Sequence, residues 1–192
     1  MDALACARRV GPSGRIIGVD LTRKMIDLAT RHAAEAGLTN LEFRLGTIEA
    51  LPVDDASADV VISNCALSLS PAKDRVLSEV WRVFKPGGRL AITDLATLRP
   101  LPASVRDALA TRLGLIGGTP PAEEYGDALD RVGFADTSIQ VLHAFVLADV
   151  ALLEATALGG GILAAVPESR LHAADGALAA IPTAANKRVD MR

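Results

Sequence analysis

The chain has 192 residues, a net charge of −3 at pH 7, 50% apolar residues and only 3% aromatic residues. This balance excludes an intrinsically disordered chain, and the length is sufficient to bury a sizeable core. The acidic balance and the low aromatic content argue against nucleic-acid binding, which uses basic patches and aromatic stacking. The two cysteines cannot build a disulfide framework, so we expect a cytoplasmic protein. No apolar run is long enough to predict a membrane span.

Strand-like and helix-like segments alternate over the first two thirds of the sequence. A buried strand is predicted at Arg15–Asp20, followed by a helix that Thr22 can cap and that ends at Ala36. The apolar face of this helix is predicted to hold Met25, Ala29, Ala33 and Ala36. Further strands are predicted at Leu41–Leu45, Ala58–Asn64 and Arg89–Leu95.

The middle of the chain continues the alternation. Ser70-Pro71 resembles a cap followed by a first-turn proline. The helix that follows is predicted to end at Pro86-Gly87-Gly88 and to bury Val76, Leu77, Val80 and Phe84. The next elements predicted are a helix near Ser104–Leu113, a glycine-containing loop at Gly114–Gly118, a helix at Ala122–Val132 and a strand at Ser138–Leu142.

The C-terminal part has a weaker pattern. Ala151–Ala157 and Ser169–Ala180 are predicted as helices, and Ala184–Arg192 as a loose tail. We therefore predict a domain at residues 1–148 and a partly helical extension at residues 149–192.

The alternation of strands and helices predicts an α/β fold with a mostly parallel sheet and helices on both faces. In such sheets the ligand binds outside the carboxyl ends of the strands. Asp20, Gly46, Asn64 and Asp94 fall at or near such ends, which makes them candidates for a binding site.

Asp20 closes the first predicted strand directly before a helix. A fixed carboxylate in that place can accept hydrogen bonds from both ribose hydroxyls of a nucleotide. The alternative role is an anion that favours the helix N-terminus. In nucleotide-binding folds a Gly-rich turn lies about 20 residues earlier. Only Met1–Gly14 precede this strand, and they contain no Gly-x-Gly.

The segment Gly46–Pro52 (GTIEALP) follows the second predicted strand. A glycine there lets a flat ring approach the backbone, Ile48 could cover one face of an adenine, and Glu49 could accept from its exocyclic amine. The alternative is an ordinary strand-to-helix turn with Ile48 in the core, and the segment alone favours this alternative.

Cys65 directly follows the strand that ends at Asn64, at the edge where a ligand is expected. A partly exposed thiol there could bind a soft metal or metalloid, although an isolated cysteine is more often a small buried apolar residue. Cys6 is assigned only the buried role.

Three segments together resemble the arsenite methyltransferase family of class I S-adenosylmethionine-dependent methyltransferases. They are VGPSGRIIGVDLTRKMIDLA at 10–29, FRLGTIEALPVDDASADVVISNCALSLSPAKDRVL at 43–77 and RVFKPGGRLAITDL at 82–95. The patterns GxIExLP, SNCxxxLSPxK and RVxKPGGR are specific as a set. The resemblance implies a Rossmann-like methyltransferase fold, with S-adenosylmethionine as cofactor.

The resemblance also implies roles for individual residues. Asp20 would bind the cofactor ribose, Met25 would pack near the adenosine, and Asn64 would lie beside the methionine part. Gly46, Ile48 and Glu49 would surround the adenine. Cys65 corresponds to a cysteine that the family uses to hold trivalent arsenic, which makes it both the catalytic candidate and the metalloid ligand.

The chain departs from the family pattern at several places. The first strand and its Gly-rich loop have no counterpart, and Met1 corresponds to the interior of a helix. That strand would lie between Arg15–Asp20 and Ala58–Asn64, so we expect the sheet to be interrupted or closed up there. Leu115 replaces the second arsenic-binding cysteine, and Ser68 replaces a usual asparagine. One thiol of the family's set therefore remains, and small thiols would have to complete the arsenic coordination.

The leading functional hypothesis is methyl transfer from S-adenosylmethionine to trivalent arsenic, a reaction of arsenic detoxification. One alternative is a methyltransferase that acts on a small organic molecule. Another is an inactive remnant or a non-catalytic binding module. The expected partner is a small-molecule or metalloid acceptor, and the sequence makes no prediction about the oligomeric state.

Overall fold

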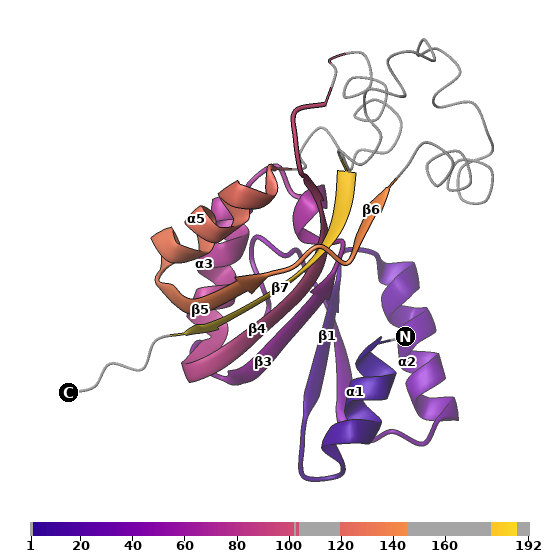
Figure 1. Ribbon diagram of the computed structural model, residues 1–192. Helices are drawn as coiled ribbons and strands as arrows, with labels where there is room; N and C mark the ends of the chain where they lie inside the picture. The colour runs from indigo at the N-terminus through magenta and orange to yellow at the C-terminus, as the bar shows by residue number, and fades with distance from the viewer. Residues whose placement is uncertain (1, 102, 104–119, 146–177, 188–192) are drawn as a thin grey trace, which may run out of the picture. The chain divides into compact units, whose positions relative to one another are not determined.

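The computed structural model describes residues 2–101, 103, 120–145 and 178–187 (Figure 1). It consists of two units, Met1–Asp54 and Asp55–Arg192, and each unit has its own sheet. Within the described residues no strand ladder joins the two sheets, so the predicted interruption between Arg15–Asp20 and Ala58–Asn64 is confirmed.

The first unit holds two helices and a parallel pair of strands. Its elements in chain order are α1 (Asp2–Val10), β1 (Ile16–Asp20), α2 (Arg23–Glu35) and β2 (Leu41–Leu45). β1 and β2 pair in register from Ile16 opposite Leu41 to Asp20 opposite Leu45. The Asn40 amide donates to the carbonyls of Ala7 and Gly11 at 2.9 and 2.7 Å, which ties the end of α1 to the start of β2.

The predicted apolar face of α2 is confirmed at Ala33 but is wrong at Met25. Ile26 and Ala33 are the buried residues, whereas 48% of Met25 is exposed. One residue along a helix turns the side chain by about 100°, so a small error in phase moves Met25 to the surface. Thr22 precedes the helix as predicted, but its side chain makes no capping hydrogen bond.

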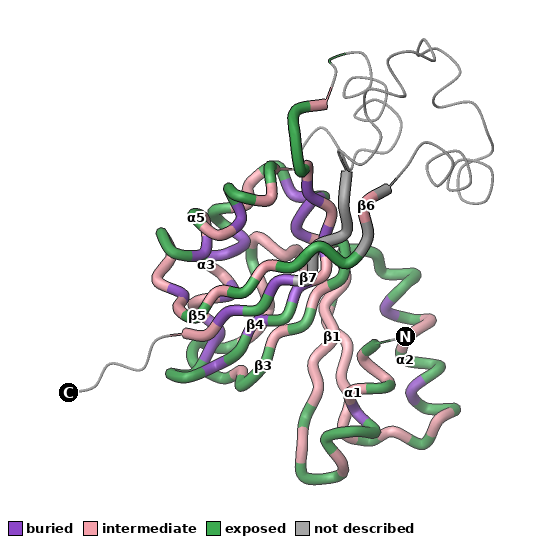
Figure 2. Tube along the Cα trace, viewed as in Figure 1, coloured by how far each residue is buried: buried purple, intermediate pink, exposed green. Residues whose placement is uncertain are grey.

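β1 was predicted as a buried strand, and this is also wrong. All five of its residues are only half-buried (Figure 2). Among the described residues β1 has a ladder with β2 alone. A strand with a neighbour on one side only buries less of its surface than a central strand.

The second unit is built around a five-stranded sheet. Along the chain its elements are β3 (Ala58–Asn64), the 3-10 helix η1 (Leu67–Leu69), α3 (Lys73–Val83), β4 (Phe84–Thr97), α5 (Ala122–Val132), β5 (Phe134–Ile139), β6 (His143–Phe145) and β7 (Leu178–Lys187). The strand order is β3-β4-β7-β5, with β6 also paired to β7. β3 and β4 are parallel, whereas β7 runs antiparallel to β4, β5 and β6.

The core of this unit lies between the sheet and the pair α3 and α5 (Figures 1 and 2). Alternate residues of β4 point into it, and the helices contribute one apolar face each. Trp81 and Phe84 both meet the Phe134 ring edge-on, with ring centroids 5.0 and 6.0 Å apart. The buried apolar residues include Val76, Leu77, Val80, Val83, Phe84, Leu90, Ile92, Ala96, Tyr125, Leu129 and Phe134.

Both ends of α3 differ from the prediction. α3 begins at Lys73, because Ser70 Oγ accepts from the Ala72 N–H at 3.1 Å in a turn before the helix. β4 already begins at Phe84, so Phe84 is buried as a strand residue. The Pro86–Gly88 segment continues the strand, and a register shift against β3 absorbs it.

The C-terminal predictions are wrong wherever the structure tests them. Leu178–Lys187 forms β7, which overlaps both the predicted helix at Ser169–Ala180 and the predicted loose tail at Ala184–Arg192. β7 pairs with β4 and β5, so it is part of the sheet. Its alanines and Pro182 are poor strand signals, and tertiary pairing overrides them.

Three predicted elements lie outside the described residues: the helix near 104–113, the loop at 114–118 and the helix at 151–157. The strand predicted at Ser138–Leu142 begins earlier, as β5, and β6 follows after a break. Within the predicted domain at residues 1–148, the chain divides into two units after Asp54.

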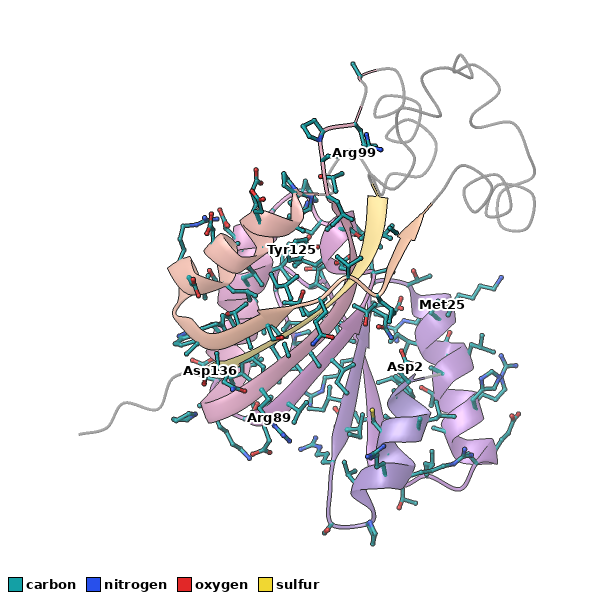
Figure 3. The ribbon with its side chains drawn as sticks, viewed as in Figure 1. Asp2, Met25, Arg89, Arg99, Tyr125 and Asp136 are labelled. Atoms are coloured by element: carbon teal, nitrogen blue, oxygen red, sulfur yellow. The ribbon has the colours of Figure 1, made fainter. Side chains whose placement is uncertain are left out.

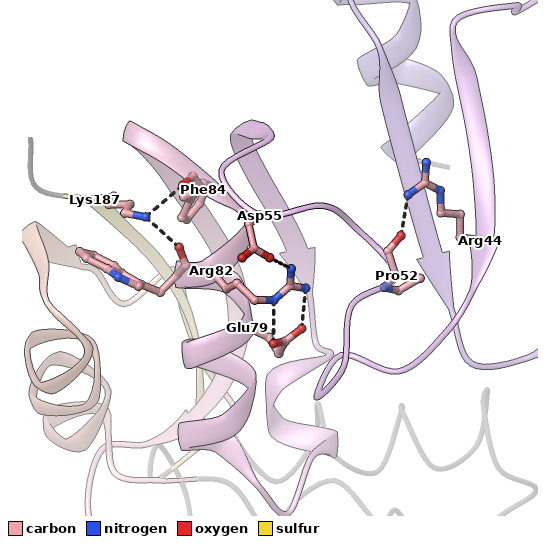
Figure 4. A network of polar contacts seen from close by, with 8 residues as sticks. Arg44, Pro52, Asp55, Glu79, Arg82, Phe84 and Lys187 are labelled. Atoms are coloured by element: carbon pink, nitrogen blue, oxygen red, sulfur yellow. Dashed lines mark hydrogen bonds and ion pairs between the residues drawn. The ribbon is translucent and has the colours of Figure 1, made fainter.

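Lys187, at the end of β7, caps the C-terminus of α3. Its Nζ donates to the carbonyls of Trp81 and Phe84 at 3.1 and 3.0 Å and lies 4.8 Å from the centroid of the Trp81 ring (Figure 4). Carbonyls at a helix end lack partners within the helix, and a cation there is favourable. One side chain thus joins the last strand to the helix layer.

We expect Lys187→Met to lower the free energy of unfolding by about 1.5–3 kcal/mol, because it removes charge-assisted hydrogen bonds and a cation–π contact. Urea denaturation measures this. The matched control is Lys85→Met, which breaks an exposed ion pair with Asp59 and should cost at most about 1 kcal/mol. Equal losses in the two variants would contradict the capping role.

Candidate functional site

In the first unit, the carboxyl end of β1 places Asp20 beside the start of α2. Its Oδ1 accepts from the Thr22 N–H at 2.7 Å, and its carbonyl accepts from the Gly46 N–H at 3.0 Å. The turn therefore fixes the carboxylate through one of its two oxygens. The other oxygen of this fixed carboxylate can accept a hydrogen bond from a ribose hydroxyl.

Gly46 has a packing reason to be glycine. A Cβ at this position would lie 2.7 Å from Pro52 Cδ, which is too close for any other residue. Arg44 Nη1 donates to the Pro52 carbonyl at 2.6 Å and holds the proline in place (Figure 4). The ring that approaches Gly46 is therefore that of Pro52, and Ile48 and Glu49 are half-buried in the same turn.

In the second unit, β3 ends in a strained turn at Cys65. This residue has a φ of +54°, in the left-handed region that costs a non-glycine residue about 1–2 kcal/mol. Its N–H donates to the Thr93 carbonyl at 2.8 Å, and the cysteine is exposed. Strain of this kind persists only where surrounding contacts enforce it, and it often marks functional sites.

Asp94 is the residue that holds this turn. It lies on the inner face of β4 and is only 1% exposed. Its Oδ2 accepts from the Ser68 N–H at 2.9 Å, and its Oδ1 accepts from the Leu95 N–H at 2.8 Å. Ser68 Oγ in turn donates to the Cys65 carbonyl at 3.4 Å. The carboxylate therefore anchors the segment that follows the cysteine.

Two further polar side chains are influenced by the charge of Asp94. Lys73 donates through Nζ to the Ser70 carbonyl at 3.0 Å; burial lowers the pKa of Lys73, and the charge of Asp94 opposes this. Tyr125 lies on the face of α5 turned toward the sheet and is 2% exposed (Figure 3). Burial raises the pKa of Tyr125, and the charges of Asp94 and Cys65 raise it further.

The Cys65 thiol has a raised pKa as well, first because of its partial burial and then because of the charge of Asp94. The protonated thiol is therefore favoured at neutral pH. The site therefore differs from those of reactive cysteines, in which nearby positive charges lower the pKa of the thiol.

The arginine network next to β3 serves the fold. Arg82 binds Glu79 through two hydrogen bonds of 2.9 and 2.8 Å and also pairs with Asp55 (Figure 4). The carbonyls of Arg82 and Val83 accept from the N–H groups of Ala56 and Ser57. These contacts fix the chain that leads into β3, and hence the strand that carries Cys65.

The predicted site residues divide between the units. Asn64 and Cys65 adjoin each other at the end of β3 in the second unit, and Asn64 also lines a hollow of about 250 Å³ with Ile62 and Thr93. The remaining five belong to the first unit: Asp20, Met25, Gly46, Ile48 and Glu49.

Sequence reasoning missed Lys73 and Tyr125 and gave Asp94 no specific role. An acidic residue at a strand end was an available signal for Asp94, as it was for Asp20. Leu115 lies outside the described residues. Across the part of the chain that the structure describes, no three His, Cys, Asp or Glu side chains gather as metal ligands, and no helix is long and apolar enough to cross a membrane.

The strain at Cys65 can be measured. We expect Cys65→Gly to be more stable than Cys65→Ala by about 0.5–1 kcal/mol, because relief of the left-handed conformation outweighs the added freedom of the unfolded chain. Urea denaturation of both variants gives the difference. The control is Ala66→Gly, at a neighbouring φ of −91°, which should lose stability. A Cys65→Gly variant less stable than Cys65→Ala would contradict the strained turn.

A curated relative, an arsenite methyltransferase from Halobacterium salinarum, is 41% identical over 138 residues, which cover 72% of this chain and 35% of the relative. A demethylmenaquinone methyltransferase from Lactococcus lactis is 42% identical over 81 residues, covering 42% of this chain and 32% of the relative. The chain thus spans about a third of the length of these relatives.

Among solved structures, an arsenic(III) S-adenosylmethionine methyltransferase from Chlamydomonas reinhardtii matches with a TM-score of 0.70 and 28% identity. The match covers 100% of this chain and 61% of that protein. The family model described as a methyltransferase domain matches residues 2–155. The fold is the Rossmann-like α/β fold of class I methyltransferases, and the chain belongs to the methyltransferase-domain family.

Proposed function

We propose that this chain takes part in methyl transfer from S-adenosylmethionine to trivalent arsenic held at Cys65. The observation that carries the proposal is the exposed thiol at the carboxyl end of β3, in a strained turn that Asp94 anchors. The similarity to arsenite methyltransferases supports arsenic as the acceptor. A reducing, cytoplasmic setting would keep this thiol free.

The residues of the first unit fit part of the cofactor. Asp20 has a fixed carboxylate with an oxygen for the ribose, and Met25 is exposed and available to the adenosine. Because Pro52 fills the space at Gly46, we assign the adenine contacts mainly to Ile48 and Glu49. Asn64, in the second unit, would meet the methionine part. The bound cofactor would supply a methyl group activated on a sulfonium sulfur.

The state of the Cys65 thiol suits the capture of arsenite. A protonated thiol can form the As–S bond while its proton leaves with a hydroxide of arsenite as water, so no general base is required. Trivalent arsenic prefers sulfur ligands, and Cys65 supplies one of them. Small thiols would take the remaining positions.

The methyl transfer itself would also require no proton transfer. The arsenic lone pair forms the As–C bond while the electrons of the S–C bond pass to sulfur. Arsenic would thereby be oxidised from the trivalent to the pentavalent state, and the electron pair would leave on the thioether sulfur that the cofactor supplies. The protein would contribute positioning and the exclusion of water.

Methyl transfer to a small organic molecule is the second candidate, because the similarity to a demethylmenaquinone methyltransferase covers 81 residues. A thiol in the acceptor site has no role in that reaction. The dependence on Cys65 therefore separates the two candidates.

We expect the full chain to form methylated arsenic from arsenite, glutathione and S-adenosylmethionine carrying a labelled methyl group, measured by mass spectrometry. Cys65→Ser should reduce the rate by at least roughly 100-fold, since a hydroxyl is a poor ligand for a soft acceptor. Cys6→Ser is the control and should retain the rate. Absence of methylated arsenic, or equal effects of the two substitutions, would contradict the proposal.

A further inference from the structure

A carboxylate occupies a place in β4 where the pattern of burial calls for an apolar residue. Leu90, Ile92 and Ala96 point to the same inner face as Asp94, and all are buried. Burying a charge is costly unless hydrogen bonds compensate it, and an apolar residue of similar size often gives a more stable core. Fold stability alone therefore does not account for Asp94.

The hydrogen bonds of Asp94 explain what the carboxylate does. One oxygen binds the N–H of Leu95 within its own strand, and the other binds the N–H of Ser68 in the turn after β3. Ser68 is itself 1% exposed and bonds back to the Cys65 carbonyl. An asparagine of the same shape offers one acceptor oxygen and so cannot bind both N–H groups.

Tyr125 gives a second, independent observation. Its hydroxyl is buried and makes no hydrogen bond of normal geometry in the described part of the chain, although the charge of Asp94 acts on it. A buried polar group without a partner costs free energy, so an orphan hydroxyl beside a site requires a reason. Hydrogen bonds at such sites are often long in the empty protein and shorten on loading.

We propose that Asp94 is a positioning residue of the acceptor site: its carboxylate, which the Tyr125 hydroxyl would join by a hydrogen bond once the site is loaded, anchors Ser68 and so holds Cys65 in the left-handed conformation that presents its thiol. This inference rests on the proposed function for the identity of the acceptor. Without the anchor, Cys65 relaxes toward ordinary backbone conformations. The apparent affinity for the acceptor then falls with the fraction of molecules that keep the presenting conformation.

The test measures the half-protecting concentration of arsenite, which is the concentration that halves the alkylation of Cys65 by iodoacetamide in the presence of glutathione. Peptide mass spectrometry reads the alkylation, with Cys6 as the internal reference. Asp94→Asn should raise the half-protecting concentration roughly 10- to 100-fold, the range expected for one lost charge-assisted hydrogen bond. The matched control is Asp74→Asn, on the exposed side of α3, which should leave this concentration unchanged.

Tyr125→Phe separates positioning from mere stability. If the Tyr125 hydroxyl has no partner and no role in the site, its removal leaves both the stability of the fold and the protection of Cys65 by arsenite unchanged or improved. We expect instead that Tyr125→Phe keeps or raises the midpoint of thermal unfolding and yet weakens the protection severalfold. Unchanged protection in both Asp94→Asn and Tyr125→Phe would overturn the inference.

Nuclear magnetic resonance separates failure of this inference from failure of the proposed function. The Ser68 amide resonance reports its bond to Asp94 and requires no arsenic. A large shift of this resonance in Asp94→Asn, but not in Asp74→Asn, supports the anchor even if arsenite fails to protect Cys65 in the unsubstituted chain. A Ser68 resonance that does not respond to Asp94→Asn would overturn the anchor itself.

Discussion

A carboxylate buried in a protein core needs hydrogen-bond donors, and this requirement determines the path of the chain around Asp94. The donors are backbone N–H groups, one within β4 and one in the turn after β3. The second of these bonds joins the helix-covered side of the sheet to the exposed Cys65 turn. The buried Ser68 donates to this one charged group and also bonds to the carbonyl of the strained residue Cys65.

The arrangement places a thiol where α/β folds bind their ligands, and it provides one sulfur and no cluster of acids or histidines among the described residues. That donor set matches a soft acceptor that carries its own lone pair, for which proton transfer is unnecessary. The raised pKa of the thiol is consistent with the proposed function, because capture of arsenite would consume the thiol proton as water. The site would thus act by orientation, and Asp94 would be the group that orients it.

The sequence predicted the elements whose patterns are local. β2, β3 and α5 have the predicted limits, because strong apolar strands and a glycine after the helix mark their ends. β7 could not be predicted in this way, since alanines and Pro182 in LAAIPTAANK become a strand only through pairing with β4 and β5. The error at Met25 in α2 has a related reason: packing decides whether Met25 or Ile26 is buried, and the sequence pattern fits both.

The candidate site shows the same limit. Strand ends and resemblance identified Asp20, Asn64 and Cys65 as candidates, whereas the partners of Asp94 come from segments far apart in the sequence. Ser68 lies 26 residues before Asp94, and Tyr125 lies on a later helix. Such contacts form only when β3, β4 and α5 pack together, so no local pattern contains them.

X-ray absorption at the arsenic edge gives the most direct test of the central claim, that Cys65 is the protein ligand of the acceptor. The sample is the full chain loaded with arsenite and freed of small thiols, compared with Cys65→Ser and Cys6→Ser. We expect one arsenic–sulfur contact that is lost in Cys65→Ser and kept in Cys6→Ser. Oxygen-only coordination in the unsubstituted chain, or a sulfur contact that survives in Cys65→Ser, would contradict this claim.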